Sequence, residues 1–169
     1  DLVRSRGLGD VYKRQVYVRE SQPEDCKVIA DNMREEDISE IKAASNWGPL
    51  EAMTDGFIHS NPPLTIIKTS DDTPVAMWGV VPEFDVGINK GRIWLLGTPG
   101  IKDVRVQFLR ESDQWIRQAT KGYDIVYNAI DKRNTLHIRW LKWLGFSIIR
   151  EMPQYGHEKR PFLEFVRII

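Results

Sequence analysis

Residues Asn134–Phe146 read NTLHIRWLKWLGF, and this stretch decides the fold. Side chains three, four and seven residues apart lie on one face of a helix. A helix here therefore has one inward face, made by the residues at offsets 0, 3, 7 and 10: Asn134, His137, Leu141 and Leu144. Gly145 is typical of the residue just past a helix end, and Phe146 begins an apolar run. We expect the inward face to pack onto a sheet.

The chain on either side of this helix alternates between strand and helix patterns. Apolar or alternating runs between turn residues predict seven strands, at Val16–Glu20, Leu64–Thr69, Val75–Val81, Arg92–Gly97, Tyr123–Ile130, Phe146–Arg150 and Pro161–Ile168. Helical periodicity predicts one helix that ends near Met33 and four others, at Glu35–Ser45, Leu50–His59, Asp103–Lys121 and Asn134–Leu144. Ser21 and Glu24 have the spacing of a capping box for the first helix. Pro82–Gly91 is expected to be a loop. This order predicts one α/β domain over residues 16–169.

Composition excludes several classes of function. The chain has 169 residues, enough for one domain with a real core. Its formal net charge is +0 with both signs interspersed, which is not the charge pattern of a nucleic-acid-binding protein. No apolar run reaches the ~18 residues that a membrane span needs. A single cysteine, Cys26, rules out an internal disulfide. The three histidines lie far apart, so we expect no metal site.

The first fifteen residues, DLVRSRGLGDVYKRQ, differ in character from the rest. They are basic and show no sustained periodicity, and they lack the apolar core of a secretory signal. The string GLGDVYKRQ resembles the translated sequencing-adaptor tails found at the ends of metagenomic open reading frames. We therefore expect residues 1–15 to be a non-native tail, the alternative being a disordered basic arm.

The order of elements resembles that of the GNAT N-acetyltransferase superfamily. The most specific match is the opening stretch, because members often carry an Asn, a small residue three positions later, an aromatic-aliphatic pair and then Leu-Gly-Phe. The resemblance implies a mixed central sheet of about six or seven strands flanked by about four or five helices. It also implies that the sheet splits, with Asn134, His137 and Leu141 facing the cleft. Asn-Thr-x-His-Ile-Arg-aromatic-Leu-Lys resembles more closely small GNAT-like proteins of short-tailed phages, some described as internal-core or virion-morphogenesis proteins.

In this superfamily the turn after the fourth strand holds the pyrophosphate of coenzyme A, because anions bind at helix N-termini. The resemblance implies a cofactor site of acetyl-CoA made by Leu96, Gly97, Thr98, Gly100, Lys102 and Asn134. Two features depart from the family pattern: Pro99 removes one backbone donor, and Asp103 places a negative charge near the phosphates. The alternative is an ordinary loop in which Asp103 caps the following helix.

The expected acid and base are less regular. Many members have a Tyr at the position of Leu141, which reprotonates the departing thiolate. His137 lies one turn earlier and is the substitute, since an unperturbed imidazole pKa near 6.5 suits proton transfer. The alternative is a half-buried histidine bonded to strand backbone. Glu83 and Asp131 are candidate general bases, together with Asp85, although loop carboxylates are usually just solvated.

Two functions follow from the resemblance. The first is an N-acetyltransferase that transfers the acetyl group of acetyl-CoA directly to an amine on a small molecule or protein, including a host protein. The second is a catalytically inactive phage internal-core, virion-morphogenesis or host-interaction protein, whose partner is a virion or host protein. The missing Tyr and phosphate signature favour the second. Either would act in the host bacterial cytoplasm or the virion.

Overall fold

The computed structural model describes residues 14–169 and contains one seven-stranded mixed sheet in the order β1-β2-β3-β4-β5-β7-β6. The strands are β1 Val16–Glu20, β2 Leu64–Lys68, β3 Thr73–Asp85, β4 Ile88–Gly97, β5 Ile125–Asp131, β6 Ser147–Tyr155 and β7 Arg160–Ile168. The helices are α1 Pro23–Asp31, α2 Glu35–Ser45, α3 Pro49–His59, α4 Arg105–Ala119 and α5 Thr135–Trp143, with a 3-10 turn η1 at Pro99–Lys102. The predicted α/β class and mixed sheet are confirmed. Most of the expected tail lies outside the described residues.

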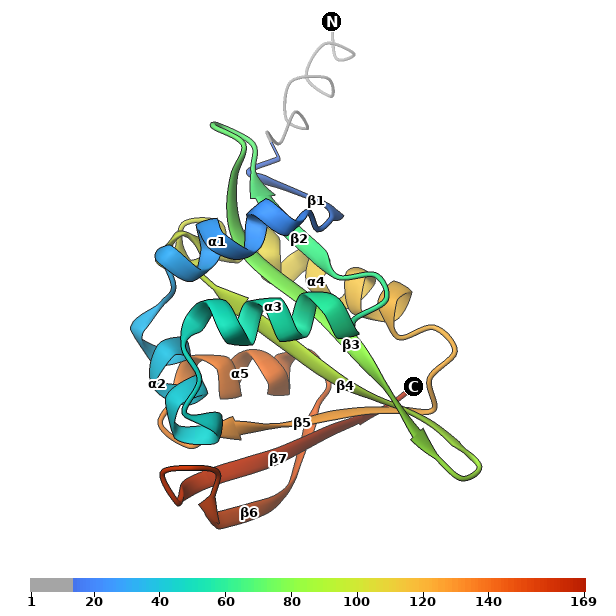
Figure 1. The fold of residues 1–169 in the computed structure, drawn as a ribbon. Helices are drawn as coiled ribbons and strands as arrows, with labels where there is room; N and C mark the ends of the chain where they lie inside the picture. The colour runs from blue at the N-terminus through green and yellow to red at the C-terminus, as the bar shows by residue number, and fades with distance from the viewer. Residues whose placement is uncertain (1–13) are drawn as a thin grey trace, which may run out of the picture.

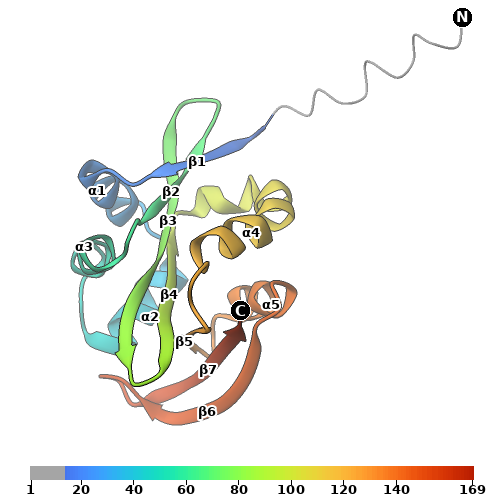
Figure 2. The same ribbon diagram turned by 90° about the vertical axis from the view of Figure 1, so that its right-hand side faces the viewer.

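The helices cover the sheet in two layers. Helices α1, α2 and α3 lie on one face, and α4 and α5 lie on the other (Figure 1, Figure 2). The larger core cluster joins the sheet to α4 and α5 through Phe108, Ile116, Trp140 and Leu144. A smaller one joins it to α1 and α3, where Ile29, Met53 and Met77 are buried. Within residues 14–169, no helix is long and apolar enough to cross a membrane.

The start of α1 differs from the expected capping box. Gln22 is the N-cap, and its N–H donates to Oδ2 of Asp25 over 2.8 Å. Ser21 instead belongs to the strand layer, because its N–H donates to the carbonyl of Pro63 and its hydroxyl accepts from Thr65. The prediction that Ser21 and Glu24 form the cap is therefore wrong by one residue.

One predicted loop, and the gap between the last two predicted strands, belong instead to longer hairpins. Pro82–Gly91 was expected to be a loop, but β3 and β4 stay paired as far as Asp85 and Ile88. The turn between them uses Gly87 at φ +81°, a conformation that favours glycine. Likewise β6 and β7 extend to a short turn between Tyr155 and Arg160. Pairing across the strands supplies hydrogen bonds that local composition does not reveal.

The segment before α4 also differs from the sequence interpretation. Asp103 was expected to open the helix, yet residues Pro99–Lys102 form a 3-10 turn and α4 begins only at Arg105. The N–H of Asp103 donates to the carbonyl of Gly100, which makes Asp103 the end of η1 and not a helix cap.

The sheet splits between β4 and β5. These strands run parallel and pair only where Lys90–Arg92 faces Ile125–Tyr127. Beyond that point β4 continues to Gly97 and β5 to Asp131 with no further pairing between them. The expected split is therefore present. It opens the sheet in front of the inward face of α5, where Asn134 and His137 are buried and Leu141 is half-buried.

Candidate active site

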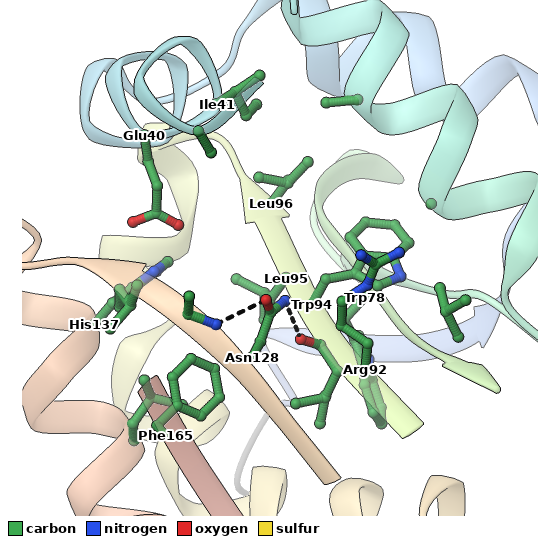
Figure 3. Close-up of a pocket in the computed structure, with 18 of the residues that line it drawn as sticks. Glu40, Ile41, Trp78, Arg92, Trp94, Leu95, Leu96, Asn128, His137 and Phe165 are labelled. Carbon is green, nitrogen blue, oxygen red and sulfur yellow. Dashed lines mark hydrogen bonds between the residues drawn. The ribbon is translucent and has the colours of Figure 1, made fainter. Parts of the chain in front are cut away.

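A cavity of about 540 Å³ occupies the split. Its narrow end is fixed by Asn128 on β5, whose Nδ2 donates to the carbonyl of Ile93 on β4 over 2.8 Å (Figure 3). Because alternate residues of a strand direct their backbone groups to the same edge, Leu95 presents its N–H and C=O to the gap. Trp94 and Trp140 line the cavity without filling it.

The cavity has two chemically different halves. The half against α4 and α5 is almost entirely apolar, and its lining residues are Phe108, Ser112, Trp115, Ile116, His137, Trp140, Leu141 and Leu144. The half against α2 and α3 carries carboxylates and small residues, namely Glu40, Ile41, Ala44, Ser45, Ala52, Asp55 and Gly56, with Trp47 between the two helices. A ligand on one side of the sheet can therefore reach a ligand on the other through the split.

Glu40 lines the cavity from α2, and the sequence analysis did not single it out. Its Oε2 accepts hydrogen bonds from the backbone N–H of Asp131 over 3.1 Å and from Nδ2 of Asn134 over 3.2 Å. Burial, followed by the negative charge of Asp37, raises the pKa of Glu40 to about 8. Figure 3 shows Glu40 reaching from α2 and His137 from α5 toward the same space. A buried carboxylate with a pKa near neutrality is a candidate for proton transfer.

His137 is buried beside this carboxylate and stays neutral. Its Nε2 lies 2.6 Å from Nη1 of Arg34, and its Nδ1 lies 3.3 Å from Nδ2 of Asn134. Burial, followed by the charge of Arg34, lowers the pKa of His137 to about 3. The expected proton-donor role assumed a pKa near 6.5. The imidazole instead joins α5 to the residue that precedes α2.

The predicted phosphate turn uses several of its backbone groups internally. The N–H of Gly97 donates to Oδ2 of Asp37 over 3.0 Å, and the N–H of Thr98 donates to the carbonyl of Val75 over 2.8 Å. A Cβ on Gly100 would lie 3.2 Å from Cγ1 of Val75, so packing against β3 already favours glycine there.

Of the predicted cofactor residues, Leu96 alone is among the residues that line the cavity, within the part of the chain that the structure describes. Lys102 is exposed on η1. Asn134 is buried, and its Nδ2 donates to Glu40. The split and its apolar half thus fit a pantetheine arm, with Leu95 and Leu96 beside it, whereas the turn offers phosphates chiefly the exposed charge of Lys102.

The predicted bases Glu83 and Asp131 lie outside the cavity lining. Glu83 accepts a hydrogen bond from the hydroxyl of Tyr127 and lies 3.9 Å from Nζ of Lys90. Asp131 is buried; burial alone would raise its pKa, but hydrogen bonds from Arg133 lower the pKa below its usual value. Both carboxylates are held by neighbouring groups, and the structure does not bring either together with His137 at the split.

Three residues of the site were missed because they sit in an acidic run, EED, or just beside it. Arg34 and Asp37 are each 1% exposed, and Glu40 follows Asp37 by one helical turn. An acidic helix start usually indicates a solvated face that complements the helix dipole. The available signal was that Asp37 lies four residues before the apolar Ile41 and hence on the buried face of α2.

Comparison with known proteins identifies structures that share this fold. No protein-family model matches the sequence, and neither does any curated protein. Among solved structures, an acetyltransferase of the GNAT family from Bacillus anthracis aligns with TM-score 0.67 and 10% identity, covering 91% of this chain and 95% of that chain. A GCN5-related N-acetyltransferase from Kribbella flavida aligns with TM-score 0.67 and 15% identity, covering 92% and 98%. A ribosomal-protein-S5-alanine acetyltransferase from Vibrio fischeri aligns with TM-score 0.61 and 14% identity, covering 91% and 93%. The chain therefore has the fold of the GNAT acetyltransferases.

Proposed function

We propose that the protein is an N-acetyltransferase that moves the acetyl group of acetyl-CoA directly to an amine. The observation that carries the proposal is the continuous cavity, because it joins an apolar half under α4 and α5 to a carboxylate-bearing half under α2 and α3. Direct transfer needs both reactants in one site, and a passage through a split sheet lets them meet from opposite faces. The shared fold with acetyltransferases supports the same activity.

The chain's own residues have distinct tasks in this reaction. Leu95 and Leu96 would lie along the pantetheine arm, with Leu141 and Trp140 as its apolar wall. Acetyl-CoA supplies an acyl group activated as a thioester. The amine nitrogen bonds to the carbonyl carbon, the carbon–sulfur bond breaks, and the thiolate of coenzyme A leaves. Glu40 takes the proton that the amine loses, because its carboxylate faces the split.

Cofactor binding is tested by calorimetric titration of the folded protein with coenzyme A. Leu141→Glu places a charge in the apolar half, so we expect it to abolish binding that the wild-type protein shows. Arg139→Glu is the matched control, since it changes charge on the exposed side of the same helix. Absence of wild-type binding at millimolar coenzyme A, or equal affinity in both variants, contradicts the proposal.

Proton transfer is tested by the pH dependence of acetylation. With a pKa of about 8, Glu40 becomes a better base as the pH rises to that value. We expect kcat to rise over this range in the wild-type enzyme. Glu40→Gln keeps an oxygen for the N–H donors but cannot accept the proton, so we expect a loss of roughly 10²-fold or more in kcat. An unchanged rate in Glu40→Gln would exclude this role.

The alternative is the catalytically inactive phage protein that the sequence resemblance also implies. Such a protein needs neither cofactor nor base, and it would act in the virion or on a host protein. The same calorimetric titration separates the two functions. A folded protein that does not bind coenzyme A would exclude the acetyltransferase and support the inactive protein.

A further inference from the structure

We infer that the acceptor is a small alkyl diamine, whose reacting amine meets Glu40 and whose second ammonium group is held by Asp55 at the rim. The inference rests on the proposed function and deepens it, because it names the class of acceptor. It draws on three features of the half-cavity under α2 and α3, which are a closed side, aromatic walls and a pair of carboxylates.

The closed side excludes an acceptor that runs through the cavity as a continuous polypeptide. The turn between β6 and β7 binds the C-terminal end of α2, where the N–H of His157 donates to the carbonyl of Ala44 over 3.1 Å and that of Glu158 donates to Ala43 over 3.0 Å. Gly156 makes this contact possible, because a Cβ at that position would lie 2.6 Å from the carbonyl oxygen of Ala43. No polypeptide passes between two segments whose backbones are bonded together.

The walls suit an apolar chain with positive ends. Trp47, Trp94 and Tyr155 line this half, and Trp47 is 42% exposed at the rim. Trp94 is fixed by the bond from its Nε1 to Oγ of Ser60 over 2.8 Å. Methylene groups pack on such rings, and an ammonium group over the face of Trp47 is attracted by its π-electrons.

The two carboxylates call for an amine that gives up a proton at Glu40 and for a cation at Asp55. Glu40 and Asp55 are the carboxylates of this half-cavity, one at the split and one on α3. Arg92 is the only permanently positive residue among the described lining residues, and its Nε already lies 3.8 Å from Oε1 of Glu83. Asp55 is half-exposed, with Nδ1 of His59 3.2 Å from its Oδ1. A monoamine would leave the carboxylate of Asp55 without a ligand partner, whereas a diamine supplies one.

The test compares two acceptors that differ by one ammonium group, 1,4-diaminobutane and butylamine. We expect the wild-type enzyme to have the higher kcat/KM for the diamine. Asp55→Asn should raise KM for the diamine by about fivefold, as for one half-exposed ion pair, and should leave butylamine unaffected. Glu51→Gln is the matched control, because it removes an exposed acid of the same helix that does not line the cavity. Asp55→Glu should restore most of the preference.

The outcomes separate this inference from the proposed function. Acetylation with equal kcat/KM for the two amines overturns the diamine assignment and leaves the acetyltransferase in place. So does a preference that Asp55→Asn leaves unchanged, or that Glu51→Gln lowers equally. A folded protein that binds no coenzyme A overturns both.

Discussion

Nη1 of Arg34 lies 2.6 Å from Nε2 of His137, which joins the residue before α2 to α5 across the split of the sheet. A guanidinium group only donates hydrogen bonds, so Nε2 must accept and the proton of the neutral imidazole lies on Nδ1. The backbone of Arg34 reinforces this link, because its N–H donates to the carbonyl of Gly97 at the end of β4. One residue therefore holds β4, α2 and α5 around the open end of the cavity.

This contact predicts that His137 stays neutral at every physiological pH. Burial and the charge of Arg34 hold its pKa at about 3, so we expect its ring nitrogens to keep the chemical shifts of a neutral imidazole between pH 5 and 8 in a nuclear magnetic resonance titration. Arg34→Met removes the second cause and should raise the pKa, although burial, the larger cause, keeps it below 6.5. A midpoint for His137 within this pH range in the wild-type protein would contradict the prediction.

Because the pKa of Glu40 is raised, we expect the free energy of unfolding to fall as the pH rises from about 6.5 to about 8. Its pKa is raised from 4.5 to about 8, so above 4.5 the folded state binds more protons than the unfolded state, and the stability contributed below 4.5 is lost as the pH passes through 8. His137 has the opposite effect, since its pKa is lowered from 6.5 to about 3, but that effect ends above pH 6.5. The pKa of Asp37 is raised to about 6, so its effect on the pH dependence of stability also ends near pH 6.5.

The measurement is urea denaturation at half-unit pH steps from 6.5 to 8.5. The wild-type slope should be negative, with a limit of about 1.4 kcal/mol per pH unit for one proton. Glu40→Gln should flatten it, whereas Glu51→Gln, an exposed acid of α3, should not. A free energy of unfolding that does not change with pH in the wild-type protein would contradict a raised pKa of Glu40.

How far the sequence predicts this molecule depends on the range of the interactions. The helix α5 could be predicted because a 3.6-residue periodicity is a local pattern. The same is true of α2, whose bounds Glu35 and Ser45 were predicted from the pattern. The extension of β3 and β4 as far as Asp85 and Ile88 was missed, because strand pairing there joins residues that local composition assigns to a loop.

The candidate site shows the same limit more strongly. His137 was found from its helical face, but its partner Arg34 is 103 residues away in the chain and no local pattern links them. The raised pKa of Glu40 depends on burial and on Asp37, which become visible only when α2 lies over the split. The geometry of this site depends on how the helices pack on the sheet, so a local sequence pattern does not predict it.

Gly156→Ala should destabilise the protein more than Gly145→Ala. Both glycines have positive φ, +72° and +81°, so each alanine incurs a similar backbone strain of about 1–2 kcal/mol. A Cβ at Gly145 meets nothing within 4 Å, whereas one at Gly156 would lie 2.6 Å from the carbonyl oxygen of Ala43 on α2. Only the second change therefore separates the β6–β7 turn from α2.

Thermal and urea unfolding of the two variants measure the difference. Loss of the two hydrogen bonds to Ala43 and Ala44 should add roughly 1–3 kcal/mol to the cost of Gly156→Ala. Hydrogen exchange at the N–H groups of His157 and Glu158 should increase in that variant alone. Equal stability of the two variants would show that the turn does not rest on α2 in solution.

Gly56→Ala tests whether α3 fixes the indole of Trp94 in the cavity wall. Alanine is favoured over glycine inside a helix by about 1 kcal/mol, so a stabilised protein is the result expected from propensity alone. The added Cβ, however, would lie 2.5 Å from Cζ2 of Trp94. The ring must move, and its bond to Ser60 is lost, so we expect a net destabilisation of about 1–3 kcal/mol.

Thr54→Ala is the control, because it also improves propensity on α3 but at an exposed position. It should leave stability and the tryptophan fluorescence of the protein nearly unchanged, whereas Gly56→Ala should lower stability in urea and alter that fluorescence. Since Trp94 also lines the acceptor half of the cavity, the KM for an amine should rise in Gly56→Ala with little effect on the affinity for coenzyme A. Equal losses for both ligands would mean that the damage spreads through the sheet, because a displaced Trp94 by itself changes only the side of the cavity that faces α3.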